Sequence, residues 1–409
     1  MSVIENYPAL RPALLLDFAN SGRVHPLIQC TRASTATCFG PDRRLRNVAA
    51  NVPRIDFDPL TGKCLGLLVE EARTNLILHS NSFSNALWTK SVPITVTPEA
   101  DDWWDISHNG TGHYAGIYQA GRPNTNKYAV FSFDIKPGSL TSASMFLGFN
   151  GTADAARAVF DFATGTSSTG SLVGVITSAM VAHSLKNMGD FWRCTLSVDI
   201  SSTSITPTSN VCYLYTGGVV SAQVAGNIKA RRAQLESATF PTSYIPTDAA
   251  AVTRAADLVG IDYTLPTVGA IVSSLAGVSS ANTSNAYIWS AINPADSTVD
   301  HAYFYHQGVV QSTNWWVKKS SVDQSGGNVV GRRLSSGFSY DSGAKAAAIA
   351  SGSLFSQDES IRPRDFPSNL SQLLLGRSRA NSGFLNGCIS RLAVYSGRIT
   401  NAQLQRLTA

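Results

Sequence analysis

The chain has 409 residues, of which 44% are hydrophobic and only 14% are charged, and its formal net charge is +5. This composition excludes a disordered chain and a long-helix protein, and its 32 glycines and many Ser and Thr residues favour an all-β fold. The small net charge, without Lys and Arg runs interleaved with aromatics, argues against nucleic-acid binding. At roughly 100 to 200 residues per domain, we expect two or three domains.

The first residues give no sign of export or membrane insertion. The stretch "MSVIENYPALRPALLLDF" lacks a basic region, and proline breaks its short apolar run, so we expect no secretory signal. Nowhere do about 18 apolar residues follow one another, so we expect no membrane insertion. We expect the protein to be made in a cytosol.

Six cysteines are scattered along the chain. They form no CxxC pair, and no histidine stands at zinc-finger spacing from them, so we expect no structural metal site. We interpret most of them as small buried hydrophobic side chains: Cys30, Cys38, Cys64, Cys194, Cys212 and Cys388.

The clearest strand patterns lie in the middle of the chain. In "FWRCTLSVDI" (191–200), the alternate residues from Trp192 to Ile200 are apolar, which is typical of a half-buried antiparallel strand. In "YAVFSFDIKPG" (128–138), Phe131, Phe133 and Ile135 share a face before a Pro-Gly turn. Glycine-bounded runs such as "NVCYLYTGG" and "GAIVSSLAG" recur, and many short strands between turns indicate sandwiches or barrels.

The stretch from 229 to 257 begins with helix formers but contains two prolines. We predict that "KARRAQLE" (229–236) is the closing strand of the central sandwich, with Ala233 and Leu235 on its packed face. The wetter face is expected to carry Ala230, Arg232, Gln234 and Glu236. Because Pro241 and Pro246 favour extended residues before them, "FPTSYIPT" is predicted as a strap along the sandwich.

One helix is predicted, at the end of the chain. Thr400 can cap "NAQLQRL" (401–407), with Gln403 placed for a capping box. We therefore predict an all-β fold of two β-sandwich (jelly-roll) domains in tandem, after a short N-terminal β/loop segment and with a short C-terminal helix. The expected parts are an N-terminal segment 1–76, a sandwich 77–250, a linker 251–257 and a second sandwich 258–409.

Three stretches carry a resemblance to known proteins. "VPRIDFDPLTGKCLGLLVEEARTNLILHSNSFSNALW" (52–88) resembles a module that recurs in tail-fibre, tailspike and head-fibre proteins of tailed bacteriophages and prophages. Residues 77–250 are similar to jelly-roll carbohydrate-binding modules, through "GDFWRCTLSV" followed by "RRAQLESATFPTSYIPT". The end, "LLLGRSRANSGFLNGCISRLAVYSGRITNAQLQRL" (373–407), resembles the last strands and helix of concanavalin-like, laminin-G-like sandwiches.

The resemblance implies a structural virion protein that is made in the bacterial host cytoplasm. It implies a fibre or spike, as a homotrimer, whose N-terminal segment docks to other virion proteins and whose sandwiches attach to bacterial surface polysaccharide. It leaves open whether the protein is a tail fibre or a capsid head fibre or decoration protein. The competing hypotheses are a glycan depolymerase or esterase on the same scaffold, and a fibre that only assembles.

Aromatic residues in polar surroundings are the candidates for glycan binding. Adjacent residues of a strand point to opposite faces, so one tryptophan of each adjacent pair is expected in the core, and the other can stack on a sugar. A core or subunit-interface role is the alternative for these pairs and for the His-Tyr-Tyr face of "DHAYFYHQ" (300–307). The candidates are Trp103, Trp104, Asp105, Trp315, Trp316, His301, Tyr303 and Tyr305.

Catalytic and metal sites have less support. Asp56 and Asp58 in "RIDFDPLTG" could bind calcium, although the same pattern is an ordinary turn without a bidentate Glu behind it. Asp101, Asp102 and Asp105 flank a tryptophan pair, but no second carboxylate with glycosidase geometry is defined, and no solenoid repeat or Gly-X-Ser-X-Gly elbow occurs. We therefore expect a non-enzymatic protein without a cofactor.

Overall fold

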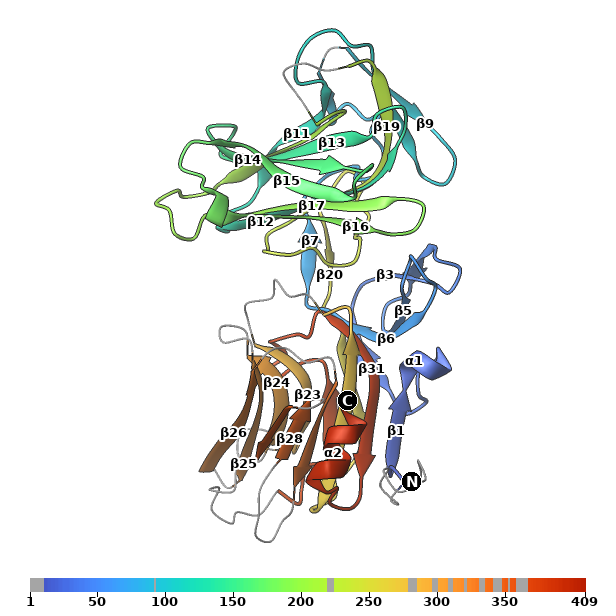
Figure 1. The fold of residues 1–409 in the computed structure, drawn as a ribbon, viewed down its shortest axis with the longest axis vertical. Coiled ribbons are helices and arrows are strands. Elements are labelled where there is room, and N and C mark those ends of the chain that lie inside the picture. Colours follow the sequence, from blue (N-terminus) through green and yellow to red (C-terminus); the bar gives the residue numbers. More distant parts are fainter. Residues whose placement is uncertain are drawn as a thin grey trace. The chain divides into compact units, whose positions relative to one another are not determined.

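The computed structural model describes residues 11–91, 93–218, 224–278, 285–295, 301–307, 312–319, 322–330, 335–340, 348–351, 354–357 and 367–409. Within these ranges the chain is almost entirely antiparallel β structure, which confirms the predicted fold class (Figure 1). It forms two compact units: a central unit, Pro59–Thr61 and Arg73–Arg254, and a terminal unit, Met1–Asp58, Gly62–Ala72 and Ala255–Ala409.

The central unit is a sandwich of two six-stranded sheets. One sheet has the order β16 (Val181–Asn187), β17 (Trp192–Asp199), β12 (Tyr128–Pro137), β19 (Gly226–Glu236), β10 (Trp104–His108) and β9 (Ile94–Pro98). The other has the order β15 (Thr166–Val173), β14 (Asp154–Asp161), β13 (Ser142–Phe149), β18 (Ser209–Tyr215), β11 (Gly116–Pro123) and β8 (Thr89–Lys90). A short 3-10 turn, Ser178–Met180, precedes β16, and β7 (Arg73–Asn75) pairs with β20 (Val252–Arg254).

The strand patterns predicted for β12 and β17 are confirmed. Phe131, Phe133 and Ile135 are fully buried between the two sheets, and so are Cys194 and Leu196. Further aromatic side chains, such as Trp88, pack against them. The apolar alternation of these strands therefore forms the core of the central sandwich.

The predicted strand at 229–236 exists, and its expected packed residues Ala233 and Leu235 are buried in the core, but its expected wetter face is wrong. A β-bulge in β19 places Arg232 at φ 57° and shifts the pairing with β12 between Ser132 and Asp134. A bulge adds one residue and reverses the inside–outside alternation beyond it. Ala230, expected on the wetter face, is therefore fully buried in the core together with Ala233.

The two polar residues after the bulge are buried because they hold the proline strap. The Glu236 carboxylate accepts hydrogen bonds from the amide and the hydroxyl of Thr242, at 3.0 and 2.6 Å. The amide of Ile245 donates to the Gln234 side-chain oxygen at 2.7 Å. Phe240 and Tyr244 pack down as predicted, so the strap is fixed by side chains of the strand that it follows.

The terminal unit is a second sandwich (Figure 1). Its eight-stranded sheet has the order β29 (Leu354–Gln357), β28 (Ala348–Ser351), β27 (Ser335–Tyr340), β22 (Gly269–Ala276), β31 (Gly387–Tyr395), β6 (Cys64–Val69) and β5 (Arg54–Phe57), with β1 (Leu14–Asp17) also paired to β31. Its seven-stranded sheet has the order β2 (Gln29–Thr31), β21 (Leu258–Asp262), β30 (Gln372–Leu375), β23 (Ala286–Ile292), β24 (His301–Gln307), β25 (Ser312–Lys319) and β26 (Val322–Val330).

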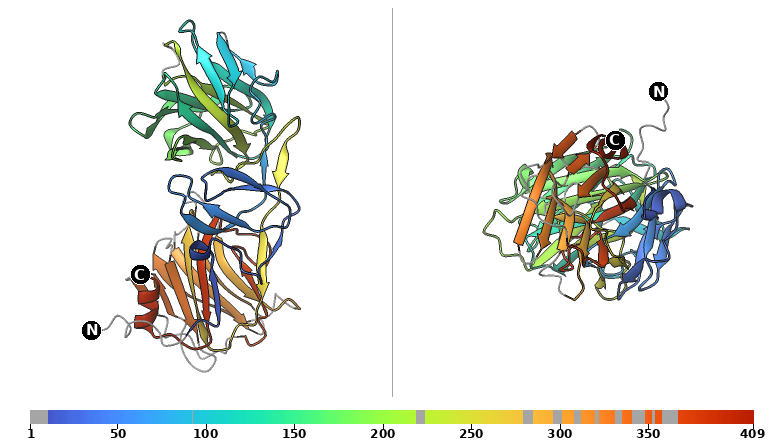
Figure 2. Two further views of the ribbon diagram at one scale, coloured as in Figure 1. Left: turned by 90° about the vertical axis from the view of Figure 1, so that its right-hand side faces the viewer. Right: turned by 90° about the horizontal axis from the view of Figure 1, so that it is seen from below.

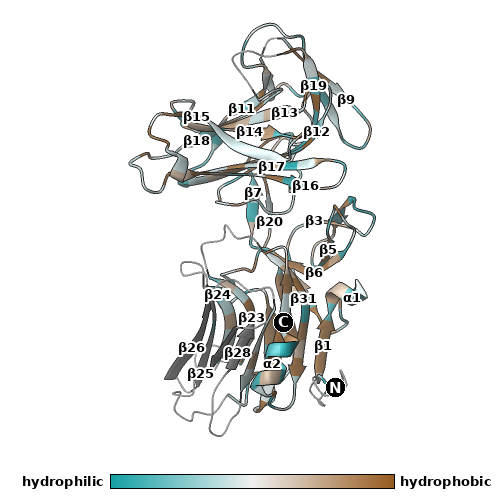
Figure 3. Cartoon of the chain, in the orientation of Figure 1, coloured by the Kyte–Doolittle hydropathy of each residue, from teal (hydrophilic) through white to brown (hydrophobic). Residues whose placement is uncertain are grey.

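The N-terminal residues do not form a segment apart from this sandwich. We expected a boundary near residue 76, but β1, β5 and β6 complete the eight-stranded sheet, and β2 is the edge of the seven-stranded one. Figure 3 shows β1 and β31 as largely hydrophobic. Leu14 and Leu16 of β1 enter the same core as Leu392 and Val394 of β31, so burial of apolar surface joins the two ends of the chain.

Asp257 holds the N-terminal residues through buried charges. Its carboxylate accepts a hydrogen bond from Arg32 at 2.8 Å, a second from Arg54 and a third from the amide of Glu70 at 2.9 Å. Arg54 also donates to the Glu70 carboxylate at 2.8 Å. Residues expected to be a linker, 251–257, therefore end in the centre of a structural ion-pair cluster.

The helices and remaining elements are short. Helix α2 (Asn401–Leu407) has the predicted capping box between Thr400 and Gln403, and it packs Leu404 on the outer side of the eight-stranded sheet (Figure 2). Helix α1 (Phe18–Ser21) and the hairpin of β3 (Ala36–Phe39) and β4 (Leu45–Val48) precede β5. Among the described residues, no helix has the length and apolar character to cross a membrane. Four cysteines are buried thiols, as predicted for most: Cys38, Cys194, Cys212 and Cys388.

Candidate functional site

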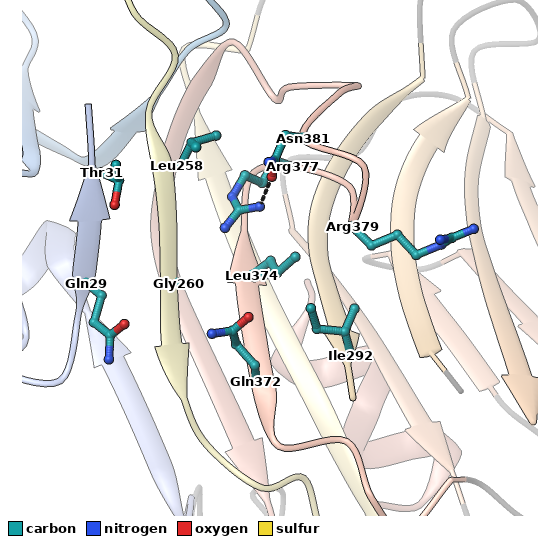
Figure 4. A pocket seen from close by; sticks show the side chains of 10 residues that line it. All are labelled: Gln29, Thr31, Leu258, Gly260, Ile292, Gln372, Leu374, Arg377, Arg379 and Asn381. Carbon is teal, nitrogen blue, oxygen red and sulfur yellow. Dashed lines mark hydrogen bonds between the residues drawn. The ribbon is translucent and has the colours of Figure 1, made fainter. Parts of the chain in front are cut away.

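A pocket of about 360 Å³ lies on the outer face of the seven-stranded sheet of the terminal unit (Figure 4). Val259, Leu373 and Leu375 of β21 and β30 point into the core. The residues that alternate with them therefore point outward and form the floor. The pocket is lined by Gln29, Thr31, Leu258, Gly260, Ile292, Gln372, Leu374, Arg377, Arg379 and Asn381.

The sheet register aligns the floor in a row across five strands. Gln29 pairs with Gly260, Gly260 with Leu374, Leu374 with Ser290, and Ser290 with Tyr303. Gly260 adds no side chain at the centre, so the backbone itself forms the bottom of the pocket. The row runs from β2 to β24 and links the pocket to one of the predicted ligand residues.

Two glutamines form one end of the pocket. The side-chain amide groups of Gln29 and Gln372 both donate to the carboxylate of Asp262, at 2.8 and 3.1 Å. The two hydrogen bonds lower the pKa of Asp262 below its usual value, so the carboxylate is ionised at neutral pH. With their NH₂ groups turned to Asp262, both glutamines keep their carbonyl oxygens as acceptors for a ligand hydroxyl.

The other end is formed by the turn between β30 and β31. Gly376, Asn381 and Gly383 have φ between 54° and 67°, and a Cβ on Gly383 would lie 2.6 Å from the Tyr287 ring. The hydroxyl of Ser290 donates to the Arg377 carbonyl at 2.9 Å and ties the turn to the sheet. The Arg377 guanidinium, which donates to Asn381, lies over the pocket (Figure 4).

A tyrosine cluster on β23 and β24, comprising Tyr287, Tyr303, Tyr305 and His301, continues the same outer face. The His301 ring stacks on Tyr303 with centroids 5.4 Å apart, and Tyr287 stacks on Tyr305 at 5.3 Å. His301 is buried, whereas the three tyrosines are partly exposed. The structure therefore places His301, Tyr303 and Tyr305 on one face, as predicted.

The second tryptophan pair is described only in its backbone. Trp316 pairs with Tyr303 across β24 and β25, and Trp315 pairs with Phe304, which lies in the core. The side chains of Trp315 and Trp316 lie outside the described residues. Their part in ligand binding stays a prediction.

The first tryptophan pair lies in the central unit and does not offer an open ring. Trp103 is 5% exposed, with the Arg231 guanidinium 4.1 Å and the Lys136 ammonium 4.7 Å from its ring centroid. Trp104 packs partly buried against the core, and its indole nitrogen donates to the Asn81 carbonyl at 2.9 Å. Asp105, the third candidate here, accepts a hydrogen bond from Asn227. Each of the three candidates therefore contacts other residues of the central unit.

The central unit carries an aromatic row that we did not predict. Tyr118, Tyr213, Phe146 and Arg157 are cross-strand neighbours on the outer face of the sheet that contains β13 and β18. The Tyr118 and Tyr213 rings stack on each other at 4.3 Å. The alternation of Tyr213 and Tyr215 in "NVCYLY" was visible, but its partners come from strands far apart in the sequence.

The weak calcium candidates lie in the terminal unit. The Asp56 carboxylate accepts a hydrogen bond from the Phe39 amide at 2.8 Å, and burial raises its pKa to about 6. The Asp58 carbonyl accepts from the Gly62 amide at 2.7 Å, which closes a turn. In the part of the chain that the structure describes, no three or more His, Cys, Asp or Glu side chains group as metal ligands do.

Sequence reasoning missed most of the pocket. Arg377 and Asn381 lie in the turn-rich stretch that resembles the last strands of laminin-G-like sandwiches. Nothing in its pattern indicates a ligand site. Gln29 and Gln372 come from opposite ends of the chain, and only the strand order β2–β21–β30 brings them together. Chemically, the assembled pocket offers acceptors at one end and a guanidinium at the other.

No protein-family model matches the chain, and no curated protein matches it. A solved structure, the Ruminococcus gnavus IT-sialidase CBM40 bound to α2,3 sialyllactose, aligns at a TM-score of 0.29 and 17% identity over 36% of this chain and 84% of that chain. The same module bound to α2,6 sialyllactose aligns at 0.28 and 14% identity, over 36% and 85% of the two chains.

Proposed function

We propose that this chain is a non-enzymatic structural protein of a virion that binds glycans through the terminal unit. The observation that carries the glycan-binding part is the pocket above Gly260, which the sheet register joins to the tyrosine cluster. A sugar suits such a site, because its hydroxyls hydrogen-bond to amides while its C–H face packs on an aromatic ring.

The virion part of the proposal rests on the sequence resemblance of residues 52–88 to phage fibre and spike proteins. We propose bacterial surface polysaccharide as the partner, with a homotrimer that raises avidity because linked sites act at a high effective concentration. Immunogold labelling of virions that carry this chain tests the location. Labelled tail tips support a tail fibre, labelled capsids support a head fibre, and unlabelled particles contradict both.

Glycan binding is tested on a bacterial polysaccharide array with the full chain. Gly260→Leu fills the pocket from its floor, where a Cβ lies 3.2 Å from the Leu373 carbonyl oxygen, and should abolish binding. Tyr303→Ala should weaken binding about tenfold by removing an aromatic contact. Tyr128→Ala, at an exposed tyrosine of the central unit, is the matched control and should bind as the parent does.

Two results would contradict the proposal. One is a chain that binds no glycan on the array. The other is binding that Gly260→Leu and Tyr303→Ala leave unchanged although circular dichroism shows both variants folded. Bound polysaccharide is also recovered and sized by chromatography, since shortening of its chains would favour the depolymerase hypothesis over a binder.

A further inference from the structure

The residues that line the pocket include positive charges and no negative ones. Arg377 and Arg379 line it, and no Asp or Glu is among the lining residues. Asp262 is the carboxylate beside it, and both of its oxygens accept from the glutamine amides at the far end. The pocket therefore carries positive charge at the turn between β30 and β31.

Arg377 is the less solvated of the two arginines. Its guanidinium donates to the neutral Asn381 side chain, and its Nε is buried without a hydrogen-bond partner in the described part of the chain. Burial lowers the pKa of the Arg377 guanidinium to about 10, and no described carboxylate offsets this effect. A partly buried cation without an anionic partner is unfavourable, so a bound anion would stabilise Arg377.

The two ends of the pocket select different groups of one ligand. The carbonyl oxygens of Gln29 and Gln372 accept hydrogen bonds and therefore suit hydroxyls. The guanidinium of Arg377 presents a planar set of donors that suits a carboxylate. Arg379 points away from Arg377 in Figure 4, so a single guanidinium faces the ligand, and its charge matches a monoanion better than a phosphate dianion.

We propose that the pocket binds an acidic sugar, with the carboxylate of a uronic-acid-type residue on Arg377 and its hydroxyls on Gln29 and Gln372. This inference rests on the proposed glycan binding and narrows the class of glycan. It predicts that host polysaccharides with uronic acids are recognised and that neutral ones of similar linkage are not.

The test uses the full chain on an array that displays acidic polysaccharides, each beside its carboxyl-reduced form and a sulfated neutral glycan. The parent should bind uronate-containing glycans, with about ten- to hundredfold weaker binding after carboxyl reduction, the range for one hydrogen bond to a charged group. Arg377→Gln should lose the same factor. Arg377→Lys should keep part of the affinity, because lysine keeps the charge without the planar fork.

The control is Arg398→Gln, which removes the same charge from an exposed arginine of the same unit outside the pocket. It should bind as the parent does. Equal loss in Arg377→Gln and Arg398→Gln would overturn the inference in favour of diffuse charge attraction, as would a preference for the sulfated glycan.

The failures of the two proposals are distinguishable. Equal binding to native and carboxyl-reduced glycans, blocked by Gly260→Leu, would overturn the acidic-sugar inference and leave glycan binding in place. Absence of binding to every glycan would overturn glycan binding itself. Thermal unfolding of Arg377→Gln accompanies the array, so that loss of affinity is read only from a folded variant.

Discussion

Arg54 and Arg377 lie in the same compact unit, and comparing their surroundings separates a structural arginine from a ligand-binding one. Arg54 is fully enclosed, and it donates to two carboxylates and to the Thr37 carbonyl. Burial alone would lower its pKa, but Glu70 and Asp257 outweigh burial and raise it above its ordinary value. Among the described residues, the one hydrogen-bond partner of the Arg377 guanidinium is the neutral amide of Asn381, and the pKa of Arg377 is lowered.

This difference in charged partners distinguishes an arginine that stabilises the fold from one that can bind a ligand. A charge whose carboxylate partners the fold supplies contributes to the fold and has little left for a ligand. A guanidinium placed over a pocket without an anion has retained its binding capacity at some cost to stability. Substitutions at the two positions should therefore affect different measurements.

The largest effect is expected for Asp257→Ala. It leaves Arg32 and Arg54 buried without their shared carboxylate and should lower the free energy of unfolding by about 3 to 5 kcal/mol. Urea unfolding measures this loss. Asp42→Ala is the control, because it breaks an exposed ion pair with Arg46 and should leave the free energy of unfolding nearly unchanged. Similar losses in both variants would contradict the distinction between buried and exposed pairs.

Trp103→Ala should have the next largest effect. The Trp103 ring contacts Arg231 and Lys136 and meets Phe191 edge-on at 5.9 Å between ring centroids, so its removal should lower stability by about 3 kcal/mol. Trp103→Phe keeps an aromatic face and should lose less than half as much. A variant with weaker glycan binding but unchanged stability would contradict this structural role and show that Trp103 takes part in binding.

Asp56 predicts a pH dependence of stability. Burial raises its pKa from 3.8 to about 6, so the folded state holds the proton more tightly than the unfolded state. The stabilisation is complete below about pH 4 and is lost as the pH rises through about 6, with a total loss of about 3 kcal/mol. Asp56→Asn keeps an acceptor for the Phe39 amide and should lack this decline. Parallel pH curves for parent and variant would contradict the assignment.

Arg377→Gln should have the smallest effect on stability. No buried partner loses its ion pair, so the unfolding free energy should stay within about 0.5 kcal/mol of the parent value or rise slightly. Urea unfolding at neutral pH measures it. A loss as large as that of Asp257→Ala would show that Arg377 is structural and would remove the contrast with Arg54.

Local sequence patterns correctly predicted the strands whose buried faces follow simple alternation and the helix whose cap is formed by neighbouring residues. β12 and β17 bury the expected side chains, and α2 has the expected cap. The wetter face of β19 was mispredicted because a bulge depends on pairing with β12, which no local pattern encodes. For the candidate site, the common face of His301, Tyr303 and Tyr305 was predicted, whereas the pocket beside it was not.

The amino-acid sequence by itself determined the all-β class, the tandem sandwiches and the capped terminal helix, because alternation, turn residues and caps act over a few neighbouring residues. Only the tertiary structure decided that the N-terminal strands complete the terminal sandwich and that Asp257 collects two arginines. It alone brought Gln29 and Gln372 to one carboxylate and left Arg377 without a carboxylate partner in the described part of the chain. Strand order and the burial of charge are properties of the whole fold, so a residue's partners, and its remaining capacity to bind, follow from packing.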